Sequence, residues 1–249
     1  MALFDLTGKI AFVTGSSRGI GRAAALLLAK LGAQVVFHGS RSSVRLASAT
    51  AAAGAGAVSF VADFEKFGAA EKLADDLIGS AKAPDILVLN ASVQSYTGLE
   101  NFDAGEFARM FRANVESACI LLRKLLPEMR KRGSGRVIFV GSINGVRPAS
   151  RLAVYGATKA ALMNLARTAA KDNAPYGITV NTILPGVIET DRNAERLGDA
   201  KFAEELRARI PMHRFGTADD CAGAIAFLAS DAAAYITGAK IPVSGGWQL

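Results

Sequence analysis

The segment from Lys9 to Leu31 constrains the fold of this chain more than any other. A short apolar run of strand type, Lys9 to Thr14, leads into a turn that reads Gly15-Ser16-Ser17-Arg18-Gly19-Ile20-Gly21, and an Ala- and Leu-rich stretch of helical character follows. Glycine lets the backbone approach a pyrophosphate, and the N-terminus of a helix offers free N–H groups. Although any tight turn can use glycines, a strand, a glycine turn and a helix in this order predict a phosphate site.

Apolar runs of strand type recur along the chain, with longer helix-like stretches between them. They span residues 34–38, 57–61, 86–90, 136–141, 178–184 and 240–243. Such alternation is typical of right-handed βαβ units, and nearly all-apolar strands fit a sheet that is buried on both faces. The 249 residues are 51% hydrophobic, enough for one large core. We therefore expect a single α/β domain over residues 1–249, a doubly wound, parallel seven-stranded sheet with helices on both faces.

Ser142, Tyr155 and Lys159 together predict a proton-transfer device. Tyr155 and Lys159 are four positions apart, so on a helix they share one face. A free tyrosine has a pKa of about 10, and a neighbouring ammonium favours the phenolate and lowers that pKa. The Ser142 hydroxyl could hold the substrate oxygen that gains or loses the proton. Because Tyr-x-x-x-Lys is common on ordinary helices, this interpretation depends on the rest of the chain.

Over nearly its whole length the chain resembles the short-chain dehydrogenase/reductase family. Six motifs carry the resemblance, and they occur in the family's order: Thr14-Gly15-x-x-x-Gly19-x-Gly21, Asp63, Asn90-Ala91, Asn114, the Ser142/Tyr155/Lys159 set, and Pro185-Gly186-Val187-Ile188-Glu189-Thr190. One departure is Leu89-Asn90-Ala91-Ser92, where the family has Asn-Asn-Ala-Gly. We expect this difference to change the loop near the nicotinamide ribose slightly without loss of function.

The resemblance implies a Rossmann fold and an NAD(P)(H)-dependent oxidoreductase that interconverts a carbonyl and a secondary alcohol. Tyr155 would be the general acid or base, and Lys159 would also bind the nicotinamide ribose. Asn114 would hold a water molecule that links Lys159 to solvent. The cofactor would contact Gly15, Ser17, Arg18, Gly19, Ile20, Gly21, Ser40, Arg41, Asp63, Phe64, Asn90, Ala91, Tyr155, Lys159, Pro185, Gly186, Ile188 and Thr190.

The charge pattern around the second predicted strand favours NADP(H) over NAD(H). Relatives that use NAD often carry an acid at the position that aligns with Gly39, where it holds the ribose 2′-hydroxyl. No acidic residue lies between Asp5 and Asp63, and Arg18 and Arg41 could bind a 2′-phosphate. Six of the basic residues fall in this segment, so the net charge of +7 does not require a nucleic-acid partner.

The substrate-binding residues are expected after the fourth and fifth strands and in a lid-like segment at about residues 187–215. Arg147 directly follows the catalytic-serine segment and would suit a carboxylate or phosphate. The many charges of residues 187–215 are interpreted mainly as a solvated helical face. The expected substrate contacts are Gln94, Ser142, Asn144, Arg147 and Tyr155.

Three functions from different classes remain open. A small polar substrate, such as a sugar acid or polyol, is favoured because Ile210-Pro211-Met212 and Gly245-Gly246-Trp247 resemble gluconate-type relatives. A 3-oxoacyl thioester reductase is the alternative, with the basic cluster Arg130-Lys131-Arg132 docking an acidic carrier protein. A non-catalytic cofactor-sensing protein is the third, and the intact set of catalytic residues argues against it.

Location and assembly follow from weaker patterns. Residues 1–6 lack the basic and long apolar regions of a leader, and no apolar run approaches the ~20 residues of a membrane span, so we expect a cytoplasmic protein. Cys119 and Cys221 give no metal-binding spacing, and no metal is expected.

Apolar side chains lie on nearly all sides of the helix that carries Tyr155, and a long helix over residues 105–131 offers a matching surface. We expect a homotetramer with twofold interfaces.

Overall fold

The computed structural model describes residues 3–249, so Met1 and Ala2 of the predicted leaderless stretch lie outside the described residues. Seven parallel strands form one sheet in the order β3-β2-β1-β4-β5-β6-β7. This confirms the predicted seven-stranded Rossmann topology. The strands are β1 (Ile10–Val13), β2 (Gln34–Gly39), β3 (Val58–Val61), β4 (Ile86–Leu89), β5 (Gly135–Val140), β6 (Ile178–Pro185) and β7 (Lys240–Val243).

The strand order reverses between β1 and β4. From β1 the chain runs outward to β2 and β3, and then returns to β4 on the other side of β1. Phe12 in β1 therefore pairs with Val36 of β2 on one side and with Leu87 of β4 on the other. In open α/β sheets, ligands bind at such a switch point, outside the carboxyl ends of the strands. β1 and β4 are apolar throughout and buried almost completely, as expected for strands covered on both faces.

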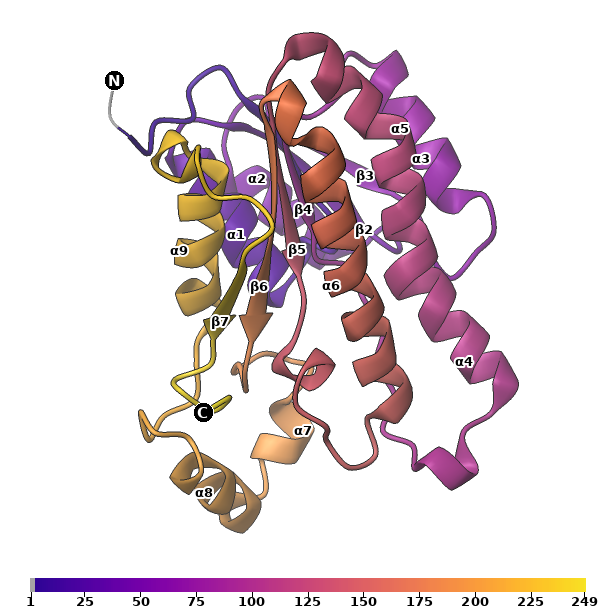
Figure 1. Cartoon of the computed structure of the whole chain (residues 1–249), viewed down its shortest axis with the longest axis vertical. Helices are drawn as coiled ribbons and strands as arrows, with labels where there is room; N and C mark the ends of the chain where they lie inside the picture. Colours follow the sequence, from indigo (N-terminus) through magenta and orange to yellow (C-terminus); the bar gives the residue numbers. More distant parts are fainter. Residues whose placement is uncertain (1–2) are drawn as a thin grey trace.

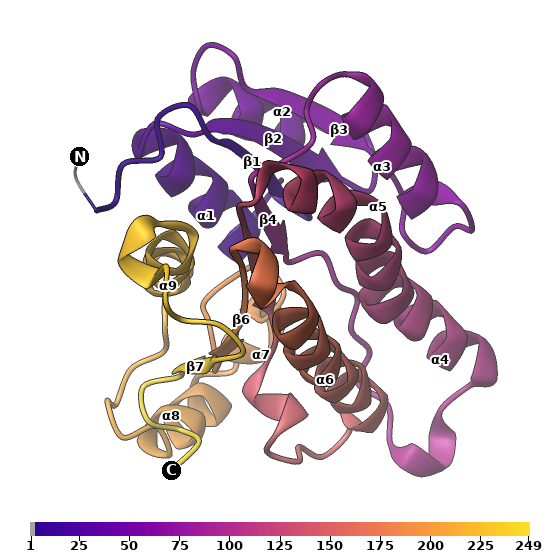
Figure 2. The ribbon, with the colours of Figure 1, turned by 45° about the horizontal axis from the view of Figure 1, so that its top comes forward.

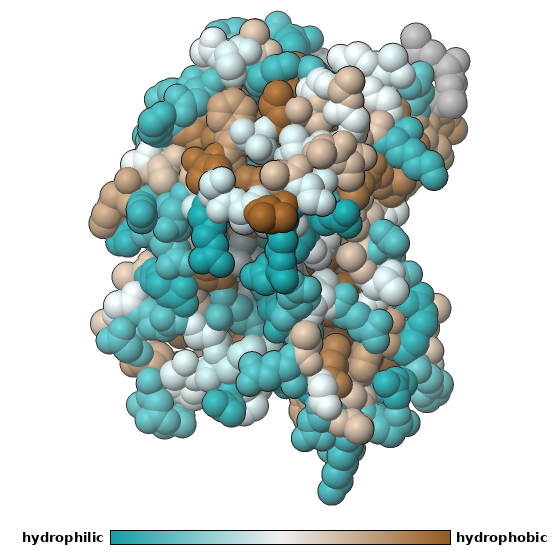
Figure 3. All heavy atoms as spheres, turned by 180° about the vertical axis from the view of Figure 1, so that it is seen from behind, coloured by the Kyte–Doolittle hydropathy of each residue, from teal (hydrophilic) through white to brown (hydrophobic). Residues whose placement is uncertain are grey.

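Helices cover both faces of the sheet (Figures 1 and 2). One face carries α1 (Gly19–Lys30), α2 (Val44–Ala52) and α9 (Ala218–Ala229), whose buried side chains form one core cluster with the strands. The other face carries α3 (Ala69–Gly79), α5 (Ser117–Arg132) and α6 (Ala153–Asn173), which form the second cluster. Figure 3 shows hydrophilic side chains over much of the face seen from behind.

The helix predicted over residues 105–131 is interrupted, which corrects the expectation of one continuous helix. It consists of α4 (Ala104–Phe111), a π-helical segment η2 (Arg112–Glu116) and α5. π-Helical turns inside α-helices occur frequently at functional sites, because the extra residue shifts side chains round the helix axis. Asn114 lies in the middle of this segment.

Two short helices follow β6 in the segment predicted as a lid. They are α7 (Ala194–Leu197) and α8 (Ala200–Ala208), and Figure 1 shows them beyond the carboxyl ends of β6 and β7, near the C-terminus of the chain. Within residues 3–249, no helix has the length and apolar character needed to cross a membrane. Over the same residues, no group of three or more His, Cys, Asp or Glu side chains is placed to hold a metal ion.

Candidate active site

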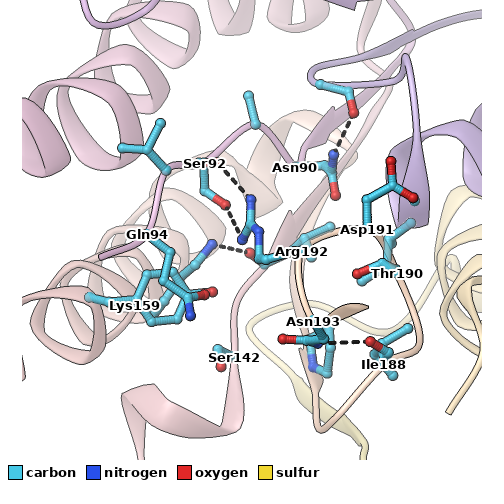
Figure 4. Close-up of a pocket in the computed structure, with 18 of the residues that line it drawn as sticks. Asn90, Ser92, Gln94, Ser142, Lys159, Ile188, Thr190, Asp191, Arg192 and Asn193 are labelled. Atoms are coloured by element: carbon cyan, nitrogen blue, oxygen red, sulfur yellow. Dashed lines mark hydrogen bonds between the residues drawn. The ribbon is translucent and has the colours of Figure 1, made fainter. Parts of the chain in front are cut away.

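A cavity of about 680 Å³ opens where the strand order reverses, at the carboxyl ends of the central strands. Of the residues predicted to bind the cofactor, Gly21 does not line this cavity; the others do. Figure 4 shows part of this wall. The predicted residues that line it are Gly15, Ser17, Arg18, Gly19, Ile20, Ser40, Arg41, Asp63, Phe64, Asn90, Ala91, Tyr155, Lys159, Pro185, Gly186, Ile188 and Thr190.

The glycine turn is shaped for close approach of a ligand. Gly15 and Gly19 have φ of +65° and +56°, which residues with a side chain rarely adopt. Among the described residues, no side chain caps the N-terminus of α1. A Cβ at Gly19 would lie 3.4 Å from the Thr190 side chain and narrow the space between them. A Cβ at Gly21 would lie 2.4 Å from the Gly15 carbonyl oxygen, so only glycine lets α1 pack this closely against the turn. This cradle, with uncapped N–H groups, fits a dinucleotide phosphate.

Asn90 fixes the glycine turn to the end of β4. Its Nδ2 donates to the carbonyl oxygens of Thr14 at 2.9 Å and Gly15 at 3.1 Å. The Thr14 hydroxyl oxygen in turn accepts from the backbone N–H groups of Asn90 and Ala91, both at 2.9 Å. These bonds join the two strands at the switch point and form a rigid floor beneath the cavity.

His38 is part of this floor, although no sequence pattern assigned it a role there. Its Nδ1 accepts from the Gly15 N–H at 3.0 Å, which places the proton on Nε2, and Nε2 lies 2.9 Å from the Ala62 carbonyl oxygen. The ring stacks on Phe64 at a centroid separation of 4.5 Å. Burial lowers the pKa of His38 to about 4, so the neutral ring supports the turn at physiological pH.

The two arginines predicted for a 2′-phosphate differ in their surroundings. Arg41 and Arg18 both line the cavity next to Gly39. Arg18 also forms an ion pair with Asp191 at 3.5 Å, and Arg45 forms a second pair with the same carboxylate. Asp191 therefore brings an acid from the lid segment to this end of the cavity, which the sequence did not suggest.

Ser142, Tyr155 and Lys159 meet at one wall of the cavity, as predicted. Ser142 follows β5, while Tyr155 and Lys159 lie one turn apart on α6, and all three are buried. The Lys159 ammonium lies 5.5 Å from the centroid of the Tyr155 ring, and its Nζ donates to the Val140 carbonyl oxygen at 2.9 Å. A phenol, a hydroxyl and an amine therefore converge where a substrate oxygen could bind.

The electrostatics of this wall differ from the prediction that Lys159 lowers the pKa of Tyr155. Burial raises the pKa of Tyr155, and the main opposing charge is that of Arg192. Burial, together with the charge of Arg192, also lowers the pKa of Lys159 to about 7. Near neutrality the amine is therefore only partly charged, and the positive charge that acts on the pKa of Tyr155 is that of Arg192.

Asn114 does not line the cavity; it holds the loop that does. Its Oδ1 accepts from the Val93 N–H at 2.7 Å, and its Nδ2 donates to the Val93 carbonyl oxygen at 2.9 Å and the Thr158 hydroxyl at 3.1 Å. The π-helical segment turns this side chain towards α6. The predicted role of Asn114 in holding a water molecule stays a prediction.

We call one part of the cavity its substrate end, defined as the part lined by Gln94, Tyr96, Asn144, Arg192, Arg196 and Trp247. Of the predicted substrate contacts, Gln94, Ser142, Asn144 and Tyr155 line the cavity. Arg147 is not among the lining residues, and its guanidinium lies over the Trp247 ring at 5.2 Å. The arginines that line this end are Arg192 and Arg196, from the segment 187–215.

Arg192 and Arg196 belong to the charge run interpreted from sequence as a solvated face. Arg196 donates to the Tyr96 hydroxyl at 3.1 Å and lies over the rings of Tyr96 and Phe202. Arg192 reaches across the cavity to Ser92 (Figure 4). The only sequence signal for this contact was Ser92 itself, which stands where the resembling family has glycine.

Comparison with known proteins agrees with this geometry. The family described as Enoyl-(Acyl carrier protein) reductase matches residues 15–248. An L-rhamnose 1-dehydrogenase (NAD(P)(+)) from Azotobacter vinelandii is 36% identical over 97% of both chains. A solved 3-oxoacyl (acyl-carrier-protein) reductase from Agrobacterium tumefaciens C58 with NADP bound is 38% identical, covers 98% of this chain and 96% of its own, and has a TM-score of 0.93.

A candidate gluconate dehydrogenase from Agrobacterium tumefaciens has a TM-score of 0.94 at 31% identity and covers 100% of this chain and 99% of its own. These similarities span the glycine turn, the wall formed by Ser142, Tyr155 and Lys159, and the segment 187–215 together. The chain belongs to the short-chain dehydrogenase/reductase family and is an NAD(P)-dependent oxidoreductase.

Proposed function

We propose that this protein is an NADP(H)-dependent dehydrogenase/reductase that interconverts a carbonyl and a secondary alcohol on a small polar substrate, such as a sugar acid or polyol. The observation that carries the proposal is the convergence of Ser142, Tyr155 and Lys159 on the wall of a cavity that continues to the glycine turn. A dinucleotide held at the turn would place its reactive end against this wall.

Each catalytic side chain has a distinct task in this proposal. When bound, the cofactor supplies or accepts the hydride. The Tyr155 hydroxyl gives a proton to the substrate oxygen in reduction and takes it back in oxidation. The Ser142 hydroxyl donates to the same oxygen as negative charge develops on it. Lys159 donates to the ribose of the cofactor from its buried position, and Asn114 positions the Val93 backbone beside them.

NADP(H) is the proposed cofactor in preference to NAD(H). β2 ends at Gly39 without a carboxylate that could accept from a ribose 2′-hydroxyl, and Arg41 lines the cavity beside it. A 2′-phosphate would accept charge-assisted hydrogen bonds from Arg41 and Arg18. To bind it, Arg18 would exchange its exposed pair with Asp191 for the phosphate, which costs little because exposed ion pairs contribute about 0–1 kcal/mol.

The lining of the substrate end supports a polar substrate. Gln94, Asn144 and the Tyr96 hydroxyl offer hydrogen-bonding groups, and Arg192 and Arg196 add positive charge. Hydroxyl-rich sugar acids and polyols can bond to such groups, whereas an alkyl chain offers them no hydrogen-bond partner. The L-rhamnose 1-dehydrogenase among the similar proteins acts, by its name, on a sugar.

A 3-oxoacyl thioester reductase is the second candidate, favoured by the similarity to the solved 3-oxoacyl reductase. The basic cluster at the end of α5 gives it little support. Arg132 donates to the Pro84 carbonyl oxygen and pairs with Asp85 at 3.2 Å, next to the amino end of β4. The cluster therefore lies at the amino-terminal ends of the strands, and the cavity opens at their carboxyl ends. An acidic carrier protein docked at the cluster would face away from Tyr155.

A substrate panel tests the proposal. Sugar acids, polyols and 3-oxoacyl thioesters are assayed with NADP(H) and with NAD(H), and Tyr155→Phe measures background turnover. We expect the highest kcat/KM for a sugar acid or polyol with NADP(H). A higher kcat/KM for the thioesters would select the second candidate, and cofactor binding without turnover of any class would favour a cofactor-sensing protein.

We also propose a cytoplasmic homotetramer, in which each chain is one domain with a lid over the cavity. Phe107 on α4 is 40% exposed and stacks on Phe111 at 4.5 Å, which leaves an aromatic surface beside η2 that a second copy could cover. Light scattering at micromolar concentration tests this. A monomer mass would contradict it, and Phe107→Glu should lower the mass if this surface is an interface.

A further inference from the structure

Arg192 stands apart from the other charges of the lid segment because it extends into the catalytic centre. It leaves the chain between β6 and α7 and reaches the loop that follows β4 (Figure 4). Its Nη1 donates to the Ser92 hydroxyl at 3.1 Å, and its Nη2 donates to the Ser92 carbonyl oxygen at 2.7 Å. These two bonds hold the guanidinium across the cavity.

Within residues 3–249, no carboxylate forms an ion pair with Arg192. Its positive charge acts to lower the pKa of both Tyr155 and Lys159. Among the described residues, the acids that line the cavity are Asp63, Glu65 and Asp191, and these lie towards the cofactor end; Asp191 itself pairs with arginines there. The substrate end therefore presents positive charge next to the reacting groups without a carboxylate to neutralise it.

We propose that Arg192 binds a carboxylate of the substrate, on a carbon near the one that reacts. A guanidinium has five N–H donors in a planar fork that matches a carboxylate, and the bonds to Ser92 leave several of them free. Arg196 is less suited, because the Tyr96 hydroxyl and two aromatic rings already engage it. This inference rests on the proposed function and narrows its substrate class from sugar acids and polyols to hydroxy acids.

Ser92 is the positioning residue in this proposal. Its hydroxyl and carbonyl oxygens accept from the two terminal nitrogens of Arg192 and fix the plane of the guanidinium. Glycine at this position would keep the carbonyl contact but lose the hydroxyl contact. The side chain that departs from the family pattern is therefore the one that aims the arginine.

The test compares matched acids and neutral alcohols in binding, so it does not depend on turnover. Glycerate and glycerol, threonate and threitol, and gluconate and glucitol are each titrated into the enzyme–NADPH complex by calorimetry; both partners are reduced, so no reaction occurs. We expect at least one acid to bind about tenfold or more tightly than its neutral counterpart, since a charge-assisted hydrogen bond contributes about 1.5–3 kcal/mol. Arg192→Gln should lower the affinity for that acid by about 10- to 100-fold, and Arg192→Lys and Ser92→Gly should lower it by less. The affinities for the neutral alcohols should not change.

Arg207→Gln is the matched control, because Arg207 lies on α8 of the same lid, pairs with Glu204 and does not line the cavity. It removes the same charge and should leave acid binding unchanged. Equal affinity for acids and alcohols in the wild type, absence of binding by every acid, or equal losses in Arg207→Gln and Arg192→Gln would each overturn the proposal.

NADPH affinity is measured for the same variants. A loss in Arg192→Gln as large for NADPH as for the acid would assign the arginine to a cofactor phosphate instead. Failure of the proposed function looks different: acids would bind with the expected dependence on Arg192, yet neither sugar acids nor polyols would turn over with NADP⁺.

Discussion

Lys159→Met should remove a pH dependence of stability that the wild type carries. The Lys159 side chain is 2% exposed, and its Nζ donates to the Val140 carbonyl oxygen. Burial, with a smaller effect from the charge of Arg192, lowers the pKa of Lys159 from 10.5 to about 7. A buried amine resists its charged form, whereas the unfolded chain holds the proton easily.

The sign and size follow from proton linkage. Below pH 7 both the folded and the unfolded chain carry the proton on Lys159. The folded chain then contains a buried charge, which lowers the free energy of unfolding by the full amount. Between pH 7 and 10.5 only the unfolded chain carries it, so the free energy of unfolding rises with pH, by up to about 1.4 kcal/mol per pH unit. The fall in pKa from 10.5 to about 7 corresponds to about 5 kcal/mol in all, of which about 2 kcal/mol should appear between pH 7 and 9.

Urea unfolding at pH 7, 8 and 9, at one protein concentration, measures this difference. The advantage of Lys159→Met over the wild type should shrink by about 2 kcal/mol over that range, because the variant lacks the titrating amine. Lys171→Met removes an exposed lysine from the same helix and should track the wild type at every pH. Parallel curves for the wild type and Lys159→Met would refute the argument that Lys159 is held in a desolvated site.

Three further variants probe other parts of the site. Tyr155→Phe should lower kcat by about 100-fold or more and leave the NADPH dissociation constant, measured by fluorescence, nearly unchanged; turnover close to the wild type would show that another group transfers the proton. Gly39→Asp should lower the NADPH-to-NADH ratio of kcat/KM by about tenfold or more, because a carboxylate repels the 2′-phosphate; an unchanged ratio would place the phosphate elsewhere. Gly21→Ala should lower the free energy of unfolding by about 1–3 kcal/mol, because its Cβ would lie 2.4 Å from the Gly15 carbonyl oxygen; a denaturation midpoint equal to the wild type would mean that the turn relaxes freely.

The sheet was predictable because each strand carries its own signal. Strands buried on both faces are continuous apolar runs, and the predicted ranges agree with β1 to β7 to within about one residue at most ends. The shared face of Tyr155 and Lys159 was predictable for a similar reason, since it needs only a helix. Their grouping with Ser142, which follows β5, rested on the family resemblance and not on a local pattern.

The π-helical segment could not be read from periodicity. Residues 105–131 keep an apolar pattern that one α-helix would satisfy, and nothing in that pattern marks the extra residue at η2. Asn114 reaches the Val93 backbone and the Thr158 hydroxyl, which are far away in sequence. The direction of the pKa shift at Tyr155 could not be predicted either, because it depends on how completely the fold buries the phenol.

Asp191 and Arg192 show why a run of charges can hide a site. On a regular solvated helix neighbouring charges would share one environment, but these two lie in the turn before α7, where successive side chains point to different walls of the cavity. Asp191 pairs with Arg18 and Arg45 beside the glycine turn, and Arg192 bonds to Ser92 beside the catalytic wall. The lid segment is therefore tied to both halves of the cavity by adjacent residues.

The ion pairs of Asp191 involve side chains that are half exposed or more, so each contributes at most about 1 kcal/mol. Contacts of this strength can break at little cost in free energy.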